Sequence, residues 1–144
     1  MIREANLDDL DYIFDIELLC FKATDDNEDL EVLKSFIEED RYRTFVATNE
    51  GKVVGYLTCE DMGNAYYVTS IAVIPEFRKL GVAGSLLNTS HEDMPIGYNM
   101  FCEIRSGNYP SQRFFEKHGF KKVNTLEKFY QDELGFYYET ERKR

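Results

Sequence analysis

The chain has few cysteines, and their positions do not suit cross-linking or metal binding. Cys20, Cys59 and Cys102 are odd in number and lie far apart. None belongs to a Cys-x-x-Cys pair or to the histidine spacing of a zinc site. We therefore expect no disulfide framework and no metal, and we interpret the three side chains as buried thiols.

Long apolar runs, linkers and low-complexity segments are also absent. No stretch approaches the roughly 20 apolar residues that a membrane-spanning helix needs, and residues 1–6 show no signal-peptide pattern. No segment rich in Pro, Gly or Ser divides the 144 residues, a length that suits one domain with a full core. We expect a single domain over residues 1–144, in a soluble cytoplasmic protein that does not contact membranes.

Positively charged residues are outnumbered by acidic ones. Seventeen Lys and Arg stand against twenty-seven Asp and Glu, which gives a formal net charge of −10. Such a chain is poorly suited to sequence-independent binding of nucleic-acid phosphates. It suits a cationic partner such as an amine, a basic peptide or a polyamine, although solubility alone accounts for the charge equally well.

The hydrophobic pattern changes its period along the chain and predicts a mixed α/β protein. Apolar residues recur at helical spacing in four segments, 7–21, 30–40, 80–91 and 109–118, and the acidic stretch 24–29 is a predicted loop. Strand-like segments bounded by turn residues are 45–48, 53–58, 65–73, 98–104, 120–123 and 136–140. With a short N-terminal strand the order is β-αα-βββ-α-β-α-ββ. This order predicts a mixed, mostly antiparallel sheet of about seven strands with helices on both faces.

An apolar strand, a glycine-bearing turn and a helix start follow one another at residues 71–87. The first N–H groups of a helix have no partner inside it and carry partial positive charge, so they attract an anion. Gly81 and Gly84, with the small Ala83 between them, allow a diphosphate to approach the backbone. We therefore predict that this junction holds phosphate.

Other glycine loops fit this junction less well. A Walker-type loop needs Gly-Lys-Ser or Gly-Lys-Thr after four intervening residues, and no stretch supplies it. A dinucleotide fingerprint needs Gly-x-Gly-x-x-Gly, for which Gly81 and Gly84 are too sparse. An ordinary strand-to-helix turn is the remaining alternative, and the presence of Pro75 and Arg78 in register with the strand argues against it.

Two blocks of the sequence resemble one known family. The spacing Arg78-x-x-Gly81-x-Ala83, after a strand that ends in Val-x-Pro, resembles motif A of the GNAT superfamily of acyl-CoA-dependent N-acetyltransferases. Residues 103–120 resemble motif B, and they are most similar to the branch that acetylates protein N-termini, including ribosomal-protein alanine acetyltransferases. The predicted element order is also that of the GNAT fold. The resemblance implies acetyl transfer from acetyl-CoA to a primary amine by direct attack in a ternary complex, by a monomer or a homodimer.

The resemblance also assigns residues to the cofactor. In the family, the strand before the loop aligns the pantetheine arm and offers backbone N–H groups to the thioester oxygen, while the loop holds the diphosphate. Asn108 matches an asparagine that hydrogen-bonds the arm, although a helix cap explains it as well, and the Ser85 side chain can equally face solvent. The implied cofactor-binding residues are Ile71, Ala72, Val73, Arg78, Lys79, Leu80, Gly81, Val82, Ala83, Gly84, Ser85, Asn108 and Phe115.

Glu103 matches the position of the general base in that branch. Strand alternation places it on the same side as Arg105, so a surface ion pair between the two is the alternative. The strand 65–73 offers no carboxylate or histidine, and Glu60 on the neighbouring strand is the reserve candidate.

Phe115 stands where the family commonly has a tyrosine that protonates the thiolate of CoA. Phenylalanine has no proton to donate, so Tyr130 or Tyr109 takes that role, or water does, or the protein is a non-catalytic acyl-CoA-binding or regulatory module. We interpret the late aromatic residues as core and rim of the sheet rather than as a substrate cage: Phe129, Tyr130, Phe136, Tyr137 and Tyr138.

A comparison of pKa values favours one kind of acceptor amine. Keeping a lysine side chain neutral at pH 7 costs about 4.6 kcal/mol, whereas an α-amine costs only about 1.4 kcal/mol. A site with one moderate base therefore suits a peptide or protein N-terminus more easily than a lysine or a small amine.

Overall fold

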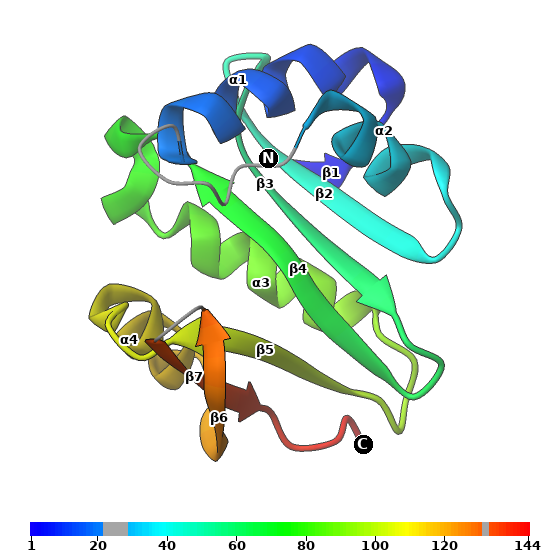
Figure 1. The fold of residues 1–144 in the computed structure, drawn as a ribbon. Helices are drawn as coiled ribbons and strands as arrows, with labels where there is room; N and C mark the ends of the chain where they lie inside the picture. The colour runs from blue at the N-terminus through cyan, green and yellow to red at the C-terminus, as the bar shows by residue number, and fades with distance from the viewer. Residues whose placement is uncertain (22–28, 131–132) are drawn as a thin grey trace. The chain divides into compact units, whose positions relative to one another are not determined.

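The computed structural model describes residues 1–21, 29–130 and 133–144, and the side chains of 128–130 lie outside the described part. A seven-stranded sheet has the order β1-β2-β3-β4-β5-β7-β6 (Figure 1). Its strands are β1 (Ile2–Glu4), β2 (Tyr42–Asn49), β3 (Lys52–Asp61), β4 (Ala65–Val73), β5 (Asn99–Arg105), β6 (Lys121–Tyr130) and β7 (Glu133–Glu139). The helices are η1 (Leu7–Asp9), α1 (Leu10–Phe21), α2 (Leu30–Glu38), η2 (Pro75–Leu80), α3 (Val82–Asp93) and α4 (Tyr109–Lys117).

The chain forms two compact units. Unit 1 holds residues 1–61 and 68–93, and unit 2 holds residues 62–67 and 94–144. The strand β4 contributes its first three residues to unit 2 and the rest to unit 1. The prediction of a single domain over 1–144 stays a prediction.

Local signals explain how the helices of unit 1 begin. The Asn6 side chain accepts a hydrogen bond from the Asp8 amide at 2.9 Å, and the Asp9 carboxylate accepts one from the Asn6 amide at 2.9 Å, which makes a capping box ahead of η1 and α1. Asp29 caps α2 in the same way by accepting from the Val32 amide at 2.9 Å. Both helices fall where the apolar spacing predicts them.

The β2–β3 hairpin of unit 1 closes through a tight turn. Glu50 and Gly51 both have positive φ angles, 51° and 80°, which is the geometry that matches the twist of paired strands. The helices α1 and α2 pack on one face of this hairpin and α3 on the other (Figure 1). The core on the first face consists of Ile13, Ile16, Leu33, Phe36, Val46, Val53, Tyr56 and Ala72.

The strand β3 approaches both β4 and α3 closely at Gly55. A Cβ atom on Gly55 would lie 3.0 Å from Val73 Cγ2 and 3.1 Å from the Ala72 carbonyl oxygen, with Leu86 of α3 at 3.5 Å. Glycine is therefore the residue that lets the end of β4 lie against β3 at this point.

In unit 2, β5 pairs in parallel with the start of β4 and antiparallel with β7, and β6 and β7 form a hairpin. Asn108 caps α4 by accepting from the Ser111 amide at 3.2 Å, and Gly119 follows the helix with a φ of 92°. An αL glycine after the last turn is a common helix stop, as the sequence predicts.

The predicted element order and the mixed, mostly antiparallel sheet are confirmed, and three details differ. Residues 75–80 form a 3-10 helix, so α3 begins at Val82 rather than near Leu80. The closing strands β6 and β7 are longer than predicted and pair with each other. Cys59 and Cys102 are buried free thiols as expected, but Cys20 is only half-buried. The predicted loop 24–29 lies almost wholly outside the described residues.

Two further features concern the described part of the chain alone. None of its helices is long and apolar enough to cross a membrane. It also holds no cluster of three or more His, Cys, Asp or Glu side chains that would suit a metal ion.

Candidate active site

The first turn of α3 carries the feature that suits an anion. Gly81 joins η2 to α3 with φ 78° and ψ 12°, a left-handed conformation that glycine adopts without strain. The Ser85 amide donates to the Gly81 carbonyl at 3.0 Å, so the helical ladder begins there. The amides of Val82, Ala83 and Gly84 precede it, and such first-turn amides together with the helix dipole bind phosphate.

Arg78 fastens this loop to the end of β4. Its Nε donates to the Val73 carbonyl at 2.9 Å, and one terminal nitrogen lies 3.4 Å from the Cys20 sulfur. The Cys20 thiol also reaches the Val73 carbonyl at 3.6 Å. Arg78, an exposed residue of η2, therefore ties the segment before α3 to the end of β4.

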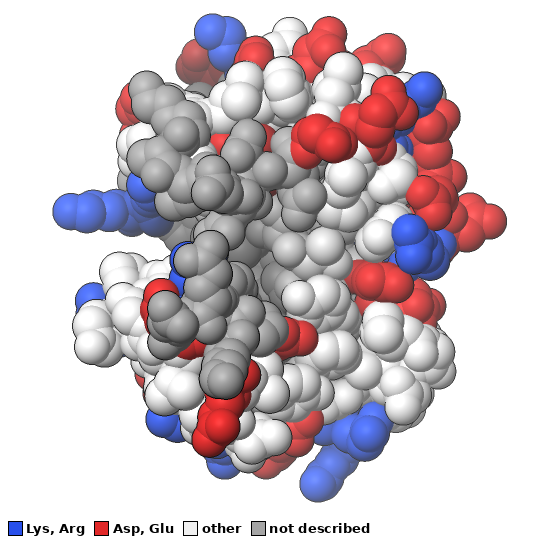
Figure 2. Space-filling model, viewed as in Figure 1, with Lys and Arg blue, Asp and Glu red and all other residues white. Residues whose placement is uncertain are grey.

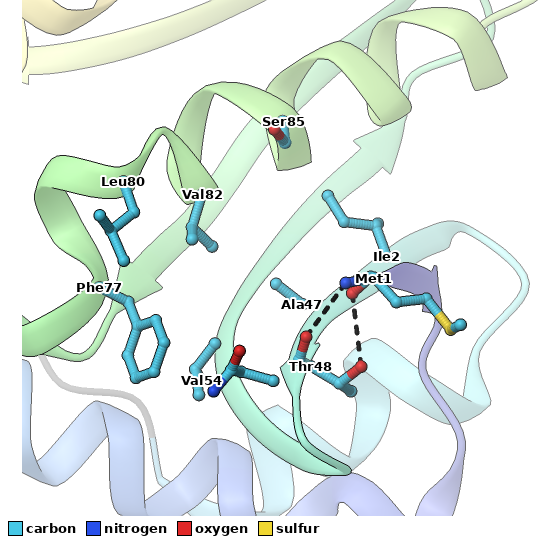
Figure 3. Close-up of a pocket in the computed structure, with 10 residues that line it drawn as sticks. Met1, Ile2, Ala47, Thr48, Val54, Phe77, Leu80, Val82 and Ser85 are labelled. Atoms are coloured by element: carbon cyan, nitrogen blue, oxygen red, sulfur yellow. Dashed lines mark hydrogen bonds between the residues drawn. The ribbon is translucent and has the colours of Figure 1, made fainter.

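A cavity of about 430 Å³ lies beside the loop in unit 1 (Figure 3). Leu80, Val82 and Ser85, which the sequence assigns to the cofactor, turn their side chains toward it, so their contribution to a diphosphate would come from the backbone. The cavity is mostly apolar and no Lys or Arg is among the residues that line it, which makes it unsuited to phosphate. Its lining residues are Met1, Ile2, Ala47, Thr48, Asn49, Val54, Phe77, Leu80, Val82 and Ser85.

Glu103 lies half-buried on β5 of unit 2. Burial raises the pKa of its carboxyl group above the ordinary glutamate value. Within the described residues its carboxylate forms no hydrogen bond or ion pair, so the alternative of a Glu103–Arg105 ion pair is not observed. Directly opposite on β7 lies Tyr137, whose pKa is raised by burial and by the charges of Glu139 and Glu103.

The reserve base Glu60 has a different environment in unit 1. Its carboxylate pairs with Arg41 at 3.7 Å, and Arg41 also binds Glu39 at 3.1 Å. The Glu60 carboxylate is thus engaged by a guanidinium, whereas the Glu103 carboxylate has no such ion pair among the described residues. The geometry therefore favours Glu103.

The structure places the remaining predicted site residues in structural roles or outside the described part. The Asn108 side chain caps α4, as the alternative interpretation holds, and its amide group has two N–H donors besides. Phe115 is 5% exposed and stacks edge-on against Phe114 and Phe120 at 5.1 and 5.0 Å between ring centres. Tyr109 is 62% exposed. The Tyr130 side chain lies outside the described residues.

The backbone expected to align the pantetheine arm forms the end of β4 in unit 1. Ala72 and Val73 are buried, and Ile71 is half-buried. The next residue, Ile74, donates its amide to the Val54 carbonyl at 2.9 Å, so hydrogen bonding to β3 extends one residue beyond β4. The segment is followed by η2 and then by α3, which is the order that the sequence predicts.

A buried polar network beside this segment was missed by the sequence reasoning. Glu17 on α1 is fully buried and accepts a hydrogen bond from the Tyr56 hydroxyl on β3. Ser70 of β4 lies 2.6 Å from the Tyr56 hydroxyl and 3.1 Å from the Glu17 carboxylate. The sequence did contain a signal for the burial of Glu17. Glu17 lies four residues, about one helical turn, after Ile13, so both side chains lie on the same buried face of α1.

Comparison with protein families places most of the chain in a known family. Residues 10–120 match the acetyltransferase (GNAT) family. Relatives named N-alpha-acetyltransferase, from Saccharolobus solfataricus and Sulfurisphaera tokodaii, are each 32% identical to this chain, covering 91% of the chain and 86% of the relative's length.

Solved structures share the fold. The ribosomal-protein-S18-alanine N-acetyltransferase from Escherichia coli has a TM-score of 0.87 at 18% identity, covering 100% of this chain and 94% of that one. NAA60 from Arabidopsis thaliana, in complex with acetyl-CoA, has a TM-score of 0.80 at 16% identity and 96% coverage of both chains.

Proposed function

The chain belongs to the acetyltransferase (GNAT) family, and from this premise we propose that its acceptor is the α-amino group of a peptide or protein. The protein is an acetyl-CoA-dependent N-acetyltransferase, and a non-catalytic acyl-CoA-binding module is not favoured. The observation that carries the proposal is Glu103, a half-buried carboxylate without a counter-cation among the described residues and with a raised pKa.

The donor end of the reaction is proposed for the backbone of unit 1. The amides of the first α3 turn would hold the diphosphate, with Arg78 adding positive charge. The backbone at 71–73 would align the pantetheine arm and meet the negative charge that develops on the thioester oxygen. For Asn108 of unit 2, a cofactor-binding role through its side-chain amide stays a proposal.

The acceptor end is proposed for Glu103. Its carboxylate would take a proton from the acceptor ammonium, directly or through water, so that the neutral amine can attack the thioester carbon. A pKa raised by burial brings this base closer to the operating pH. The departing thiolate then needs one proton, for which Tyr130 or water is proposed because Phe115 has no proton to donate.

Three considerations support an α-amine. An α-amine is easier to hold neutral at pH 7 than a lysine by about 3 kcal/mol, from pKa values near 8 and 10.4. The two relatives at 32% identity are named N-alpha-acetyltransferases. Acidic side chains cover the helices α1 and α2 (Figure 2), a distribution that suits a cationic acceptor, and the exposed ones are Asp8, Asp11, Asp15, Asp29, Glu31, Glu38, Glu39 and Asp40. The single-domain organisation, the cytoplasmic location and a monomeric or dimeric state are part of the same proposal.

The test uses paired peptides that contain one internal lysine and differ only in a free or a blocked N-terminus. Release of the CoA thiol and the mass of the product are followed with acetyl-CoA present. We expect turnover with the free N-terminus only. Equal acetylation of the lysine in the blocked peptide would overturn the proposed acceptor. Glu103→Gln should lower kcat/KM by about 10² or more, whereas the matched control Glu60→Gln should change it little.

A further inference from the structure

Three aromatic rings from three strands of unit 2 line up in one row. Phe101 on β5 lies between Tyr67 of β4 and Tyr137 of β7, with ring centres 5.0 and 5.3 Å away. All three side chains are half-buried, whereas their strand neighbours Met100 and Tyr138 are buried. The row, which we call the aromatic ladder, therefore lies on the more exposed face of these strands.

Carboxylates flank the ladder on the same face. Glu103 pairs with Tyr137 in the β5–β7 register, and Glu139 pairs with Phe101. Side chains paired in this way have Cβ atoms about 5 Å apart. The raised pKa of Tyr137, with contributions from both carboxylates, is consistent with this closeness. Arg105, the next residue on this face of β5, contributes the one positive charge of the strand.

The opposite face of β7 provides a contrast. There the Lys122 ammonium lies 4.1 Å above the Phe136 ring, so the chain itself supplies a cation to that aromatic. Among the described residues no Lys or Arg lies over the Phe101 or Tyr137 ring. Ring faces flanked by carboxylates attract an ammonium group and repel an anion, since the faces are electron-rich.

We propose that the aromatic ladder, together with Glu103, is the site that holds the acceptor as an ammonium cation before Glu103 removes its proton. Tyr137, at the end of the row, contacts the cation through the ring face turned away from Phe101, and Glu103 and Glu139 supply the opposite charge. Phe101, stacked between Tyr67 and Tyr137, holds the Tyr137 ring in place. This inference rests on the proposed function, because it names how the acceptor is recognised. It assigns Tyr137 as a specificity-determining residue for a cationic acceptor and Phe101 as the residue that positions its ring.

The test measures binding without catalysis. The probe is an acceptor peptide whose N-terminus is trimethylated, so that it keeps a permanent positive charge but cannot be acetylated. Its partner is the same peptide with a neutral 3,3-dimethylbutanoyl group of similar shape at the N-terminus. Calorimetry on the full chain gives the dissociation constant of each. We expect the cationic peptide to bind at least tenfold more tightly, and equal affinity of the two would overturn the proposal.

Variants then locate the binding. Tyr137→Leu should weaken binding of the trimethylated peptide about fivefold, the range of a half-exposed cation–π contact. Phe101→Leu should weaken it by a smaller factor, because it removes only the ring that supports Tyr137. Tyr137→Phe keeps the ring and should bind like the parent protein. The matched control Phe136→Leu removes a half-buried aromatic from the other face of β7 and should leave the affinity within twofold. If Phe136→Leu weakens binding as much as Tyr137→Leu, the ladder is not the cation site.

The outcome separates this inference from the proposed function. Loss of preference for the charged peptide, with N-terminal acetylation intact, removes the ladder as the ammonium site and leaves the acceptor assignment standing. Absence of N-terminal acetylation, with tight and ladder-dependent binding of the trimethylated peptide, removes the proposed acceptor and leaves a cation site. Each result is read from its own assay on the same protein.

Discussion

Replacing Gly81 with alanine should weaken acetyl-CoA binding far more than it weakens the fold. Gly81 has a φ of 78°, and a Cβ atom there would meet no other atom within 4 Å. The strain is therefore purely conformational, because an L side chain disfavours the left-handed region by about 1–2 kcal/mol. If the loop relieves that strain by changing φ, the amides that follow Gly81 rotate away from the direction in which they would meet the diphosphate.

The matched control is Gly51→Ala in the β2–β3 turn. Gly51 has nearly the same φ, 80°, and its Cβ would also meet nothing within 4 Å. Both variants should lose about 1 kcal/mol of unfolding free energy and about 3 °C in Tm for a chain of this size. Only Gly81→Ala should lose a hydrogen bond to a charged phosphate, which contributes about 1.5–3 kcal/mol and corresponds to a dissociation constant at least tenfold higher.

Calorimetric titration with acetyl-CoA and thermal unfolding by circular dichroism measure the two effects separately. The expected result is an equal fall in Tm for both variants and a weaker affinity in Gly81→Ala alone. Unchanged acetyl-CoA affinity in Gly81→Ala, with Tm lowered as in the control, would refute the assignment of the first α3 turn to the diphosphate. An affinity loss of the same size in Gly51→Ala would show that the measurement reports general destabilisation instead.

Three further predictions concern single side chains. Phe115→Tyr should raise kcat severalfold if the new hydroxyl reaches the leaving thiolate, and rapid-mixing measurements of CoA release would show no gain if water already supplies that proton. The raised pKa of Glu103 means that its base form appears at a higher pH than for an ordinary glutamate, so kcat/KM should rise with pH through that value, and Glu103→Gln should abolish this limb. The Asp9 pKa is lowered, chiefly by the hydrogen bond from Arg3, so its contribution to stability is complete above the ordinary value near 3.9 and is lost as the pH falls through the lower folded value. Urea unfolding of Asp9→Asn should accordingly show a loss of about 1–2 kcal/mol at pH 7 that shrinks in acid, and a loss independent of pH would contradict the pairing.

The parts of the fold that the sequence predicts well depend on local chemistry. Helix ends are predicted by residues that act on backbone groups close to them in the chain. Examples are Asn6 and Asn108 at helix starts and Gly119 at a helix end. The turn before α3 is local in the same way, because it depends on glycine at one φ angle. Pattern reading succeeds for these elements because the residues that determine them are close together in the chain.

The parts that it predicts poorly depend on which strands become neighbours. Tyr137 lies far from Phe101 in the chain and reaches it only because β7 inserts between β5 and β6 in the sheet. Composition and spacing do not predict that β7 lies between β5 and β6. From the sequence alone, Tyr137 is therefore interpreted as an ordinary rim residue. Glu17 is hidden for a similar reason, since its partners Tyr56 and Ser70 come from two different strands.

A binding site made by side chains can change its preference by substitution more easily than one made by the main chain. The donor-binding features proposed for unit 1 are made largely by the main chain, so they would tolerate many side chains and suit a donor that the whole family shares. The ladder of unit 2 is made by side chains, and replacing Phe101 or Tyr137 with an aliphatic residue leaves the strand pairing of β5 and β7 in place. The acceptor preference can therefore change without loss of the fold or of acetyl-CoA binding. Leucine at either position should reduce the preference for cationic over neutral acceptors while the KM for acetyl-CoA stays within twofold, and a parallel rise in both constants would show that the two ends are not independent.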